Sequence, residues 1–228
     1  MTPYARLEIT LITLLGAVAT AVVAWWAGPA ALLPALLSAA LLAFYRDPHR
    51  TPPRDPAAVL AAADGTIVSV RRAVPTPDGR RELRIMTFLS VFSVHVNRSP
   101  CAGRVLATAY KPGAFLNALN PAADDRNESH TLVLEPAAPL PGPVTVRQIA
   151  GVLARRIVCA ARPQDQLTAG QRFGMIKLGS RTEVCLPEDT GWEVLVAPGD
   201  KVRAGLTVLA RRRADAPAPV AVPRSDAR

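Results

Sequence analysis

Two long apolar stretches open the chain. Residues 9–27 contain no charged side chain, Gly28-Pro29 interrupts, and residues 30–45 again contain none. One membrane-spanning helix needs about 20 apolar residues, a length that the first stretch reaches and the second approaches. Arg6 precedes the first stretch and Arg46 follows the second, whereas the Gly-Pro turn carries no charge. The pattern predicts a membrane-associating helical hairpin over residues 1–45, with the following domain on the cytoplasmic side of the inner membrane.

The pattern changes after residue 45. Residues 46–58 are rich in Pro and Arg, which predicts an extended linker because proline fixes φ and lacks an amide donor. Residues 59–210 alternate short β-branched and apolar runs with Gly, Pro and Asp turns, which predicts a mainly β (α+β) domain. Residues 211–228 are rich in Pro and Ala without an apolar period, which predicts a disordered tail.

Within the β domain, the strongest strand candidates are residues 66–70, 82–89, 103–110, 130–135, 144–151, 183–186 and 192–196. Their spacing favours antiparallel pairing. Two turn-and-strand segments, 62–70 and 197–210, are similar to each other, and the second resembles the hairpins of barrel-sandwich folds. We therefore expect a barrel-sandwich-like antiparallel β domain, with short helical turns around residues 113–120 and 151–161.

Charge and composition narrow the classes of partner and cofactor. The formal net charge of +9 suits either nucleic acid or an anionic membrane surface, and the apolar N-terminus favours the membrane over nucleic acid. The three cysteines are far apart, and the three histidines form none of the spacings that are typical of zinc sites. Neither a disulfide framework nor a metal site is expected.

The most specific chemistry lies in residues 171–187, which read QRFGMIKLGSRTEVCLP. A Gly-Ser pair alone predicts a turn, but here strand-like runs stand on both sides of it. Because glycine has no side chain, the Gly179 carbonyl is sterically open to attack by the hydroxyl of Ser180. Such an attack converts the amide to an ester, and elimination followed by hydrolysis leaves a pyruvoyl group at residue 180.

This segment resembles the processing site of the phosphatidylserine decarboxylase proenzymes, in their short bacterial form. Four further blocks agree in order: FYRDPHRTPP (44–53), AADGTIVSV (62–70), FLSVFSVHVNRSPCAGRV (88–105) and VRQIAGVLARRIV (146–158). The resemblance covers the chain from about residue 9 to residue 210. It implies autocatalytic cleavage of a zymogen between Gly179 and Ser180, into a larger chain of residues 1–179 and a smaller chain of residues 180–228.

The same resemblance assigns the candidate catalytic residues. Ser180 becomes the pyruvoyl cofactor. Asp64 matches the acid of the family's Ala-Asp-Gly block, and His95 matches the histidine of its His-Val-Asn-Arg block. An acid that orients an imidazole, and an imidazole that activates a hydroxyl, form the arrangement of the hydrolase triads. Without the resemblance, Asp64 reads as a turn residue and His95 as a structural histidine.

Two positions depart from the family pattern. Long family members have a second histidine three residues after the one that matches His95, where this chain has Arg98. Either His95 serves both self-cleavage and decarboxylation, or Arg98 takes over a contact with the substrate phosphate. Asn127-Glu128 is followed by Ser129, where the family usually has arginine, and Arg126 is a candidate substitute.

The reaction implied by the resemblance converts phosphatidylserine to phosphatidylethanolamine and CO2, in phospholipid biosynthesis. A pyruvoyl carbonyl condenses with the substrate amine to a Schiff base and takes up the electrons released with CO2. The implied partners are the phospholipid substrate, the membrane and the second chain of the processed enzyme. Six arginines are candidates for contact with anionic headgroups: Arg46, Arg50, Arg54, Arg71, Arg72 and Arg98. A homo-oligomer stays an open option.

Other interpretations stay open. A membrane-anchored barrel-sandwich carrier requires a modified lysine at a hairpin tip, and none of Lys111, Lys177 and Lys201 stands in such a motif. A membrane-anchored zinc endopeptidase requires more histidine ligands than this chain offers. The same decarboxylase chemistry on another serine phospholipid leaves no sequence signature that separates the two substrates. A cleaved signal peptide fits the N-terminus less well than an anchor, because the apolar region is too long.

Overall fold

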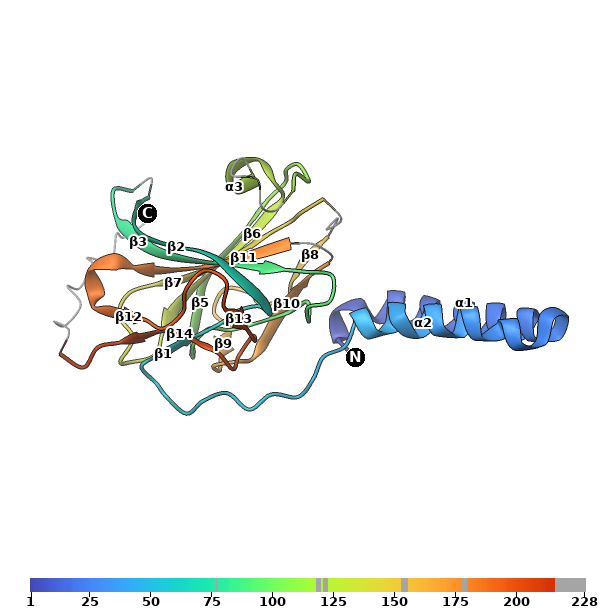
Figure 1. Cartoon of the computed structure of the whole chain (residues 1–228). Helices are drawn as coiled ribbons and strands as arrows, with labels where there is room; N and C mark the ends of the chain where they lie inside the picture. Colours follow the sequence, from blue (N-terminus) through green and yellow to red (C-terminus); the bar gives the residue numbers. More distant parts are fainter. Residues whose placement is uncertain (77, 118–119, 121–122, 153–155, 178–179, 216–228) are drawn as a thin grey trace.

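The structure is a computed structural model that describes residues 1–76, 78–117, 120, 123–152, 156–177 and 180–215. Figure 1 shows a pair of antiparallel helices, in blue, that projects from one end of a β domain. The chain passes from the helices to the domain through an extended segment along the domain's edge. The fold therefore separates an N-terminal helical part from a β part that carries the remaining elements.

The N-terminal part is a helical hairpin. Its elements are η1 (Pro3–Ala5), α1 (Arg6–Ala27), η2 (Gly28–Ala31) and α2 (Leu32–Phe44). The chain reverses at Gly28, whose φ of 49° is a left-handed value that glycine adopts without strain. Close packing of the two helices depends on Gly16, because a Cβ atom there would lie 2.2 Å from the Oγ atom of Ser38. The predicted apolar hairpin is confirmed.

The surface of this hairpin is apolar and exposed. No residue of α1 or α2 is buried, and Trp25 and Trp26 near the reversal are 87% and 83% exposed. At 1.5 Å per residue, α1 is about 33 Å long, which matches a hydrocarbon core of about 30 Å. The helical stretch Pro3–Phe44 is long and apolar enough to cross a membrane. The hairpin is therefore suited to membrane association.

The β domain is built from antiparallel strands. They are β1 (Ala58–Leu60), β2 (Gly65–Pro75), β3 (Arg81–Leu89), β4 (Val96–Arg98), β5 (Gly103–Lys111), β6 (Ser129–Pro136), β7 (Val144–Ile149), β8 (Ile157–Cys159), β9 (Gln166–Leu167), β10 (Arg172–Ile176), β11 (Ser180–Pro187), β12 (Trp192–Val194), β13 (Lys201–Val202) and β14 (Val208–Arg212), with α3 (Ala123–Arg126) and η3 (Glu188–Thr190) between them. The largest sheet has the order β13-β2-β3-β11-β7-β6-β5-β9, and it curls so that its strands cross in Figure 1. Two smaller sheets, β1-β14-β12 and β4-β10-β8, complete the domain.

The strand predictions are confirmed, and so is the mainly β class. All seven predicted runs are strands, namely β2, β3, β5, β6, β7, β11 and β12. The two expected helical turns are not helical in their described residues, and residues 118–119 and 153–155 lie outside the described part of the chain. Residues 157–159 form β8, and Ala114 forms an isolated bridge with Asn127, while α3 begins only at Ala123. Both segments pair with distant residues, β8 with β10, and such pairing overrides the local preference for a turn.

β11 is a buried inner strand of the largest sheet. β11 lies between β3 and β7 and is buried along both faces. Its Val184 packs in the core with Ile85 of β3 and Val146 of β7. Because side chains alternate along a strand, Ser180 and Thr182 lie on the same face as Val184. The first residue of β11 is thereby enclosed in the protein.

Candidate active site

Ser180 begins β11, directly after the predicted cleavage site. It is fully buried and lies opposite Leu89, the last residue of β3. Within the described part of the chain, its hydroxyl has no hydrogen-bond partner. Buried polar groups are usually paired, because desolvation is otherwise uncompensated, so an unpaired hydroxyl marks a candidate reactive group. Gly179, the other half of the predicted cleavage site, lies outside the described residues.

His95 lies beside the segment that leads to Ser180. It directly precedes β4, and its carbonyl accepts a hydrogen bond of 3.2 Å from the amide of Ile176, the last residue of β10. The imidazole is fully buried, and neither ring nitrogen has a partner with hydrogen-bond geometry among the described residues. Phe44, at the end of α2, packs on the ring with centroids 4.3 Å apart. The hairpin thus supplies one wall of the histidine's surroundings.

Electrostatics keep this imidazole neutral. Burial lowers the pKa of His95 to about 4. The positive charge of Arg46 lowers the pKa further, while the Ser93 carbonyl and the Asp64 carboxylate oppose the shift. A neutral imidazole offers one nitrogen as a proton acceptor. At neutral pH, His95 therefore has the protonation state that a general base requires.

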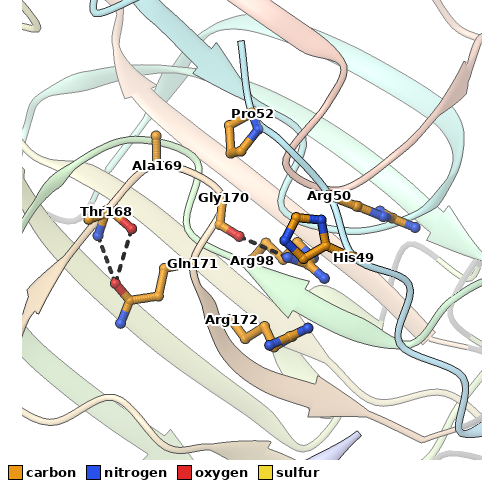
Figure 2. A pocket seen from close by; sticks show the side chains of 9 residues that line it. All are labelled: His49, Arg50, Pro52, Arg98, Thr168, Ala169, Gly170, Gln171 and Arg172. Atoms are coloured by element: carbon orange, nitrogen blue, oxygen red, sulfur yellow. Dashed lines mark hydrogen bonds between the residues drawn. The ribbon is translucent and has the colours of Figure 1, made fainter. Parts of the chain in front are cut away.

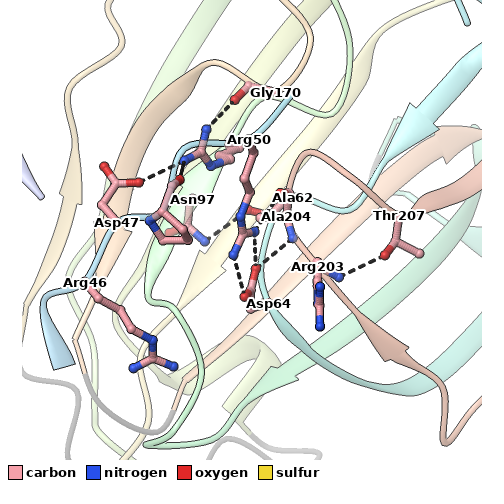
Figure 3. A network of polar contacts seen from close by, with 12 residues as sticks. Arg46, Asp47, Arg50, Ala62, Asp64, Asn97, Gly170, Arg203, Ala204 and Thr207 are labelled. Atoms are coloured by element: carbon pink, nitrogen blue, oxygen red, sulfur yellow. Dashed lines mark hydrogen bonds and ion pairs between the residues drawn. The ribbon is translucent and has the colours of Figure 1, made fainter. Parts of the chain in front are cut away.

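Asp64 is held by an arginine of the linker rather than by the histidine. Figure 3 shows Arg50 facing Asp64, with Nη1 2.5 Å from Oδ1 and Nη2 2.8 Å from Oδ2. The amide of Ala204 also donates to Oδ1 at 2.8 Å. Both side chains are largely buried, with 6% of Arg50 and 13% of Asp64 exposed. This paired carboxylate acts on His95 through its charge, since no hydrogen bond joins the two among the described residues.

Strand register brings Asp64 and Ser180 to the same end of the sheet. Thr66, Phe88 and Arg181 are paired in one row across β2, β3 and β11. Asp64 stands two residues before Thr66, and Ser180 stands one residue before Arg181, so they flank the end of β3. Because β3 lies between β2 and β11, the two residues are about two strand spacings apart, which is about 10 Å. The chain that leaves β3 then turns towards His95, so all three predicted residues lie at one corner of the domain.

A cavity of about 400 Å³ opens at this corner. Its polar lining includes Asp64, Thr66, Ser90 and Ser93, with the cations Arg46, Lys201 and Arg203. The three cations stand against a single carboxylate, which is itself paired with Arg50. Val94, the residue before His95, also lines the cavity, whereas His95 and Ser180 do not. The cavity has the size and charge to hold a small anionic group next to the candidate residues.

A buried amide network fixes the strands around Ser180. Gln148 of β7 donates from Nε2 to Oδ1 of Asn97 in β4 at 2.8 Å. Asn97 in turn donates from Nδ2 to Oγ1 of Thr182 at 3.4 Å. The network ties β4 and β7 to β11 two residues after Ser180. Sequence reasoning did not assign Gln148 a role, although it stands in one of the matching blocks.

The Arg98 side chain does not line the corner cavity. Its Nη2 atom donates to Oδ1 of Asp47 at 2.8 Å and to the Pro48 carbonyl at 3.0 Å, and its Nη1 atom donates to the Gly170 carbonyl. Arg172 also pairs with Asp47, at 2.6 Å. Figure 2 shows Arg98 beneath a second cavity of about 400 Å³, behind the linker. These contacts hold the linker on the domain, and a contact of Arg98 with substrate phosphate stays a prediction.

The segment around Asn127 packs against the end of β7, where Ile149 pairs with Arg181 of β11. Asn127 is buried and hydrogen-bonds the backbone of Leu116 through both its amide oxygen and its amide nitrogen, and it also donates to the Ala150 carbonyl. Arg126, the candidate substitute for the arginine that the family usually carries at Ser129, is exposed at the end of α3. Its role in the site stays a prediction.

An ion pair connects the hairpin to the segment before the cleavage site. Lys177 is the last described residue before Ser180, and its ammonium contacts the carboxylate of Glu8 in the first turn of α1. The side chain of Lys177 is 14% exposed and that of Glu8 is 31% exposed. Sequence reasoning did not predict this contact, because 169 residues separate the two partners.

Comparison with known proteins identifies relatives that match most of the chain. The family model for phosphatidylserine decarboxylase matches residues 37–210. A phosphatidylserine decarboxylase proenzyme from Pelobacter propionicus is 47% identical over 177 residues, which cover 78% of this chain and 79% of the relative. Proenzymes of the same name from Beijerinckia indica and Rhodopirellula baltica are 44% and 43% identical, over 89% and 92% of this chain and 87% and 88% of their own lengths.

Proposed function

The chain belongs to the phosphatidylserine decarboxylase family, and we propose that it is a zymogen that makes a pyruvoyl cofactor from its own Ser180. One observation carries the proposal: the Ser180 hydroxyl is fully buried and without a hydrogen-bond partner among the described residues. It begins a central strand at the corner where a neutral imidazole and a paired carboxylate also lie. This set supplies the nucleophile and a base for self-cleavage.

The proposed cleavage consists of an acyl shift, an elimination and a hydrolysis. The Oγ atom of Ser180 bonds to the carbonyl carbon of Gly179, and the amide C–N bond breaks, which leaves an ester and a free amine at Ser180. Loss of the Cα proton of Ser180 then expels the Gly179 carboxylate and leaves dehydroalanine. After tautomerisation, water replaces the nitrogen, which leaves as ammonia. The products are chain 1–179 with a free carboxylate and chain 180–228 with an N-terminal pyruvoyl group.

The corner residues have distinct roles in this proposal. His95 accepts the proton of the Ser180 hydroxyl, because its imidazole is neutral and its ring nitrogens are not engaged by another partner among the described residues. Asp64 stabilises the imidazolium that forms, through its charge. Arg50 holds the Asp64 carboxylate in place through two hydrogen bonds. Arg50 is thus a positioning residue, which sequence reasoning placed only among the headgroup-binding arginines.

The substrate proposed for the mature enzyme is phosphatidylserine, and the product is phosphatidylethanolamine. The pyruvoyl group, when formed, supplies the electron sink for loss of CO2 from an amine-bearing carboxylate. The residues of this chain bind and orient the lipid. Arg46, Lys201 and Arg203 line the cavity at the corner and suit the phosphate diester of the headgroup. The burial of His95 and Ser180 keeps water from the reacting atoms.

The proposed location is the inner membrane, with residues 59–210 as the decarboxylase domain on the cytoplasmic side. Apolar helices without a buried residue support the anchor. Arg6 and Arg46 at its base, with no charge at the Gly28 reversal, support the orientation. The predicted disordered tail begins later than residue 211, because Arg211 and Arg212 belong to β14 and pair with β1 and β12. Residues 216–228 are outside the described part of the chain.

Self-cleavage is tested by comparing the wild type with Ser180→Ala on a denaturing gel. We expect two fragments from the wild type and one intact chain from the variant. Ser69→Ala on β2 is the matched control and is expected to process as the wild type does. An uncut wild-type chain would overturn the proposal. The substrate is tested with carboxyl-labelled phosphatidylserine, and a processed enzyme that releases CO2 only from another serine phospholipid would favour the alternative substrate.

A further inference from the structure

The turn between β3 and β4, residues 90–94, exposes two apolar side chains next to each other. Phe92 is 84% exposed and Val91 is 41% exposed. The turn is closed by hydrogen bonds from the Ser93 amide to the Ser90 carbonyl at 3.0 Å and from the Ser90 amide to the Ser93 hydroxyl at 3.2 Å. Its backbone therefore holds both apolar side chains on the surface. In water, an exposed phenylalanine side chain lacks the stabilisation that its burial in an apolar environment would provide.

This turn is attached to the base of the hairpin. The guanidinium of Arg46 donates to the Phe92 carbonyl and also, at 3.0 Å, to the carbonyl of Ala43 in the last turn of α2. In Figure 1 the loop that follows β3 lies beside the end of the hairpin that meets the domain. The turn that carries the exposed aromatic ring is thus attached to the end of the hairpin that meets the domain.

The same turn forms one side of the corner cavity. Ser90, Phe92 and Ser93 line it, together with Lys201 and Arg203. Both of these cations are exposed, so they can meet an anionic surface directly. An apolar rim beside a cationic cavity fits a phospholipid that keeps its acyl chains in the bilayer while its headgroup enters the protein. Aromatic residues are enriched at the level of the lipid headgroups for the same reason.

We infer that the turn at residues 90–94 is a second membrane contact, which inserts Val91 and Phe92 into the bilayer interface and opens the corner cavity to an anionic phospholipid headgroup. The inference rests on the proposed function in taking the hairpin as the anchor and a phospholipid as the substrate. The turn adds what an anchor alone does not give: it fixes the mouth of the cavity at the height of the headgroups.

Kinetics on two forms of the substrate test this contact. Val91→Ser, at the apolar residue of the turn that does not line the cavity, is expected in the full, processed enzyme to lower kcat/KM on phosphatidylserine vesicles about ten-fold, through a higher apparent KM for lipid. On a short-chain phosphatidylserine dissolved as monomers, kcat/KM is expected to stay within about two-fold of the wild type, because no interface has to be entered. Val91→Ile, which keeps an apolar side chain, should act on vesicles as the wild type does. Leu106→Ser, which removes an apolar side chain on β5 that is exposed to a similar extent, is the matched control.

Equal losses on vesicles and on monomers would overturn the inference, since they would show that Val91 supports the fold or the chemistry. Unchanged activity on vesicles would overturn it as well. A second measurement does not depend on activity: a polarity-sensitive fluorophore on Phe92→Cys, in a Cys159→Ser background. We expect its emission to shift to the blue with phosphatidylserine-containing vesicles and to be quenched by brominated lipid. A blue shift that needs only a higher protein concentration would instead identify a contact between copies of the chain.

The two experiments separate the two claims. If the processed enzyme decarboxylates neither form of phosphatidylserine, the proposed substrate fails, while the fluorophore still reports whether the turn enters a bilayer. If decarboxylation proceeds but the fluorophore at residue 92 stays in water, the membrane contact fails and the proposed function stands.

Discussion

Phe44, the last residue of α2, packs its ring on the imidazole of His95, with the ring centroids 4.3 Å apart and the planes tilted by 38°. The apolar hairpin and the candidate base therefore share a direct contact. Phe44 contributes to the burial that lowers the pKa of His95 to about 4. We therefore expect the hairpin to influence the protonation of the candidate base.

Replacement of Phe44 by alanine is expected to shift the pH dependence of self-cleavage. Water reaching the imidazole raises the pKa of His95 from about 4 towards its ordinary value of about 6.5. Because the base acts in its neutral form, the acid limb of the rate moves to higher pH by the same amount. The rate is measured as the half-time of chain conversion on gels between pH 4 and pH 7. Phe44→Leu, which keeps an apolar cover, should behave as the wild type; an acid limb that stays in place in Phe44→Ala would contradict the role of the ring.

The ion pair of Glu8 with Lys177 is expected to position the segment that precedes the cleavage site. Either Glu8→Gln or Lys177→Gln should slow self-cleavage about two- to five-fold, since a partly exposed pair contributes up to about 1 kcal/mol. The exchanged pair, Glu8→Lys with Lys177→Glu, should recover most of the rate. Conversion half-times of the four proteins check this, and an exchanged pair that is slower than both single variants would rule out a role for the pair itself.

Arg50→Met should destabilise the domain and impair processing together. It leaves the Asp64 carboxylate without the two hydrogen bonds that Arg50 provides, and a broken buried pair costs about 3–5 kcal/mol. Because 13% of Asp64 is exposed, the loss is expected at the lower end of that range. Thermal unfolding in detergent measures it. Arg54→Met, at an exposed arginine of the same linker, is the control, and equal losses in both variants would remove the special role of Arg50.

The stability of the uncut chain should depend on pH through His95. The folded state holds this histidine neutral down to a pKa of about 4, whereas an unfolded histidine takes up a proton near pH 6.5. As far as it depends on His95, the free energy of unfolding is therefore highest above about pH 6.5. It falls as the pH drops from there to about 4, by at most about 3 kcal/mol. Denaturant unfolding of Ser180→Ala, with and without His95→Leu, measures it. The same slope in both proteins would show that His95 does not carry the dependence.

The hairpin and most long strands were predictable from the sequence, because each is indicated by the hydrophobic pattern of its own residues. The run at 82–89 alternates and ends in turns, and it is β3 in the structure. Charge-free residues 9–27 were equally clear as a helix. The smaller sheets were not predictable, since β8 and β10 are short and gain their pairing from strands far away in the chain. For this reason residues 157–159, where we expected part of a helical turn, form β8.

The candidate residues were named from motifs, but their contacts were not. Nothing in the sequence joins Arg50 to Asp64 or Phe44 to His95, because those contacts form only when the linker and the hairpin fold back on the domain. Arg98 illustrates the same limit. Its position beside the family's histidine block suggested phosphate binding, whereas its guanidinium contacts Asp47 and Pro48 of the linker.

The most direct test of the central claim is the intact mass of the purified wild-type protein under denaturing conditions. The account predicts two chains that end and begin at the Gly179–Ser180 bond. The smaller, 180–228, is predicted to be lighter by one ammonia than a chain that begins with serine, because its first residue is a pyruvoyl group. A single chain of 228 residues, or a smaller chain that begins with unmodified serine, would contradict it.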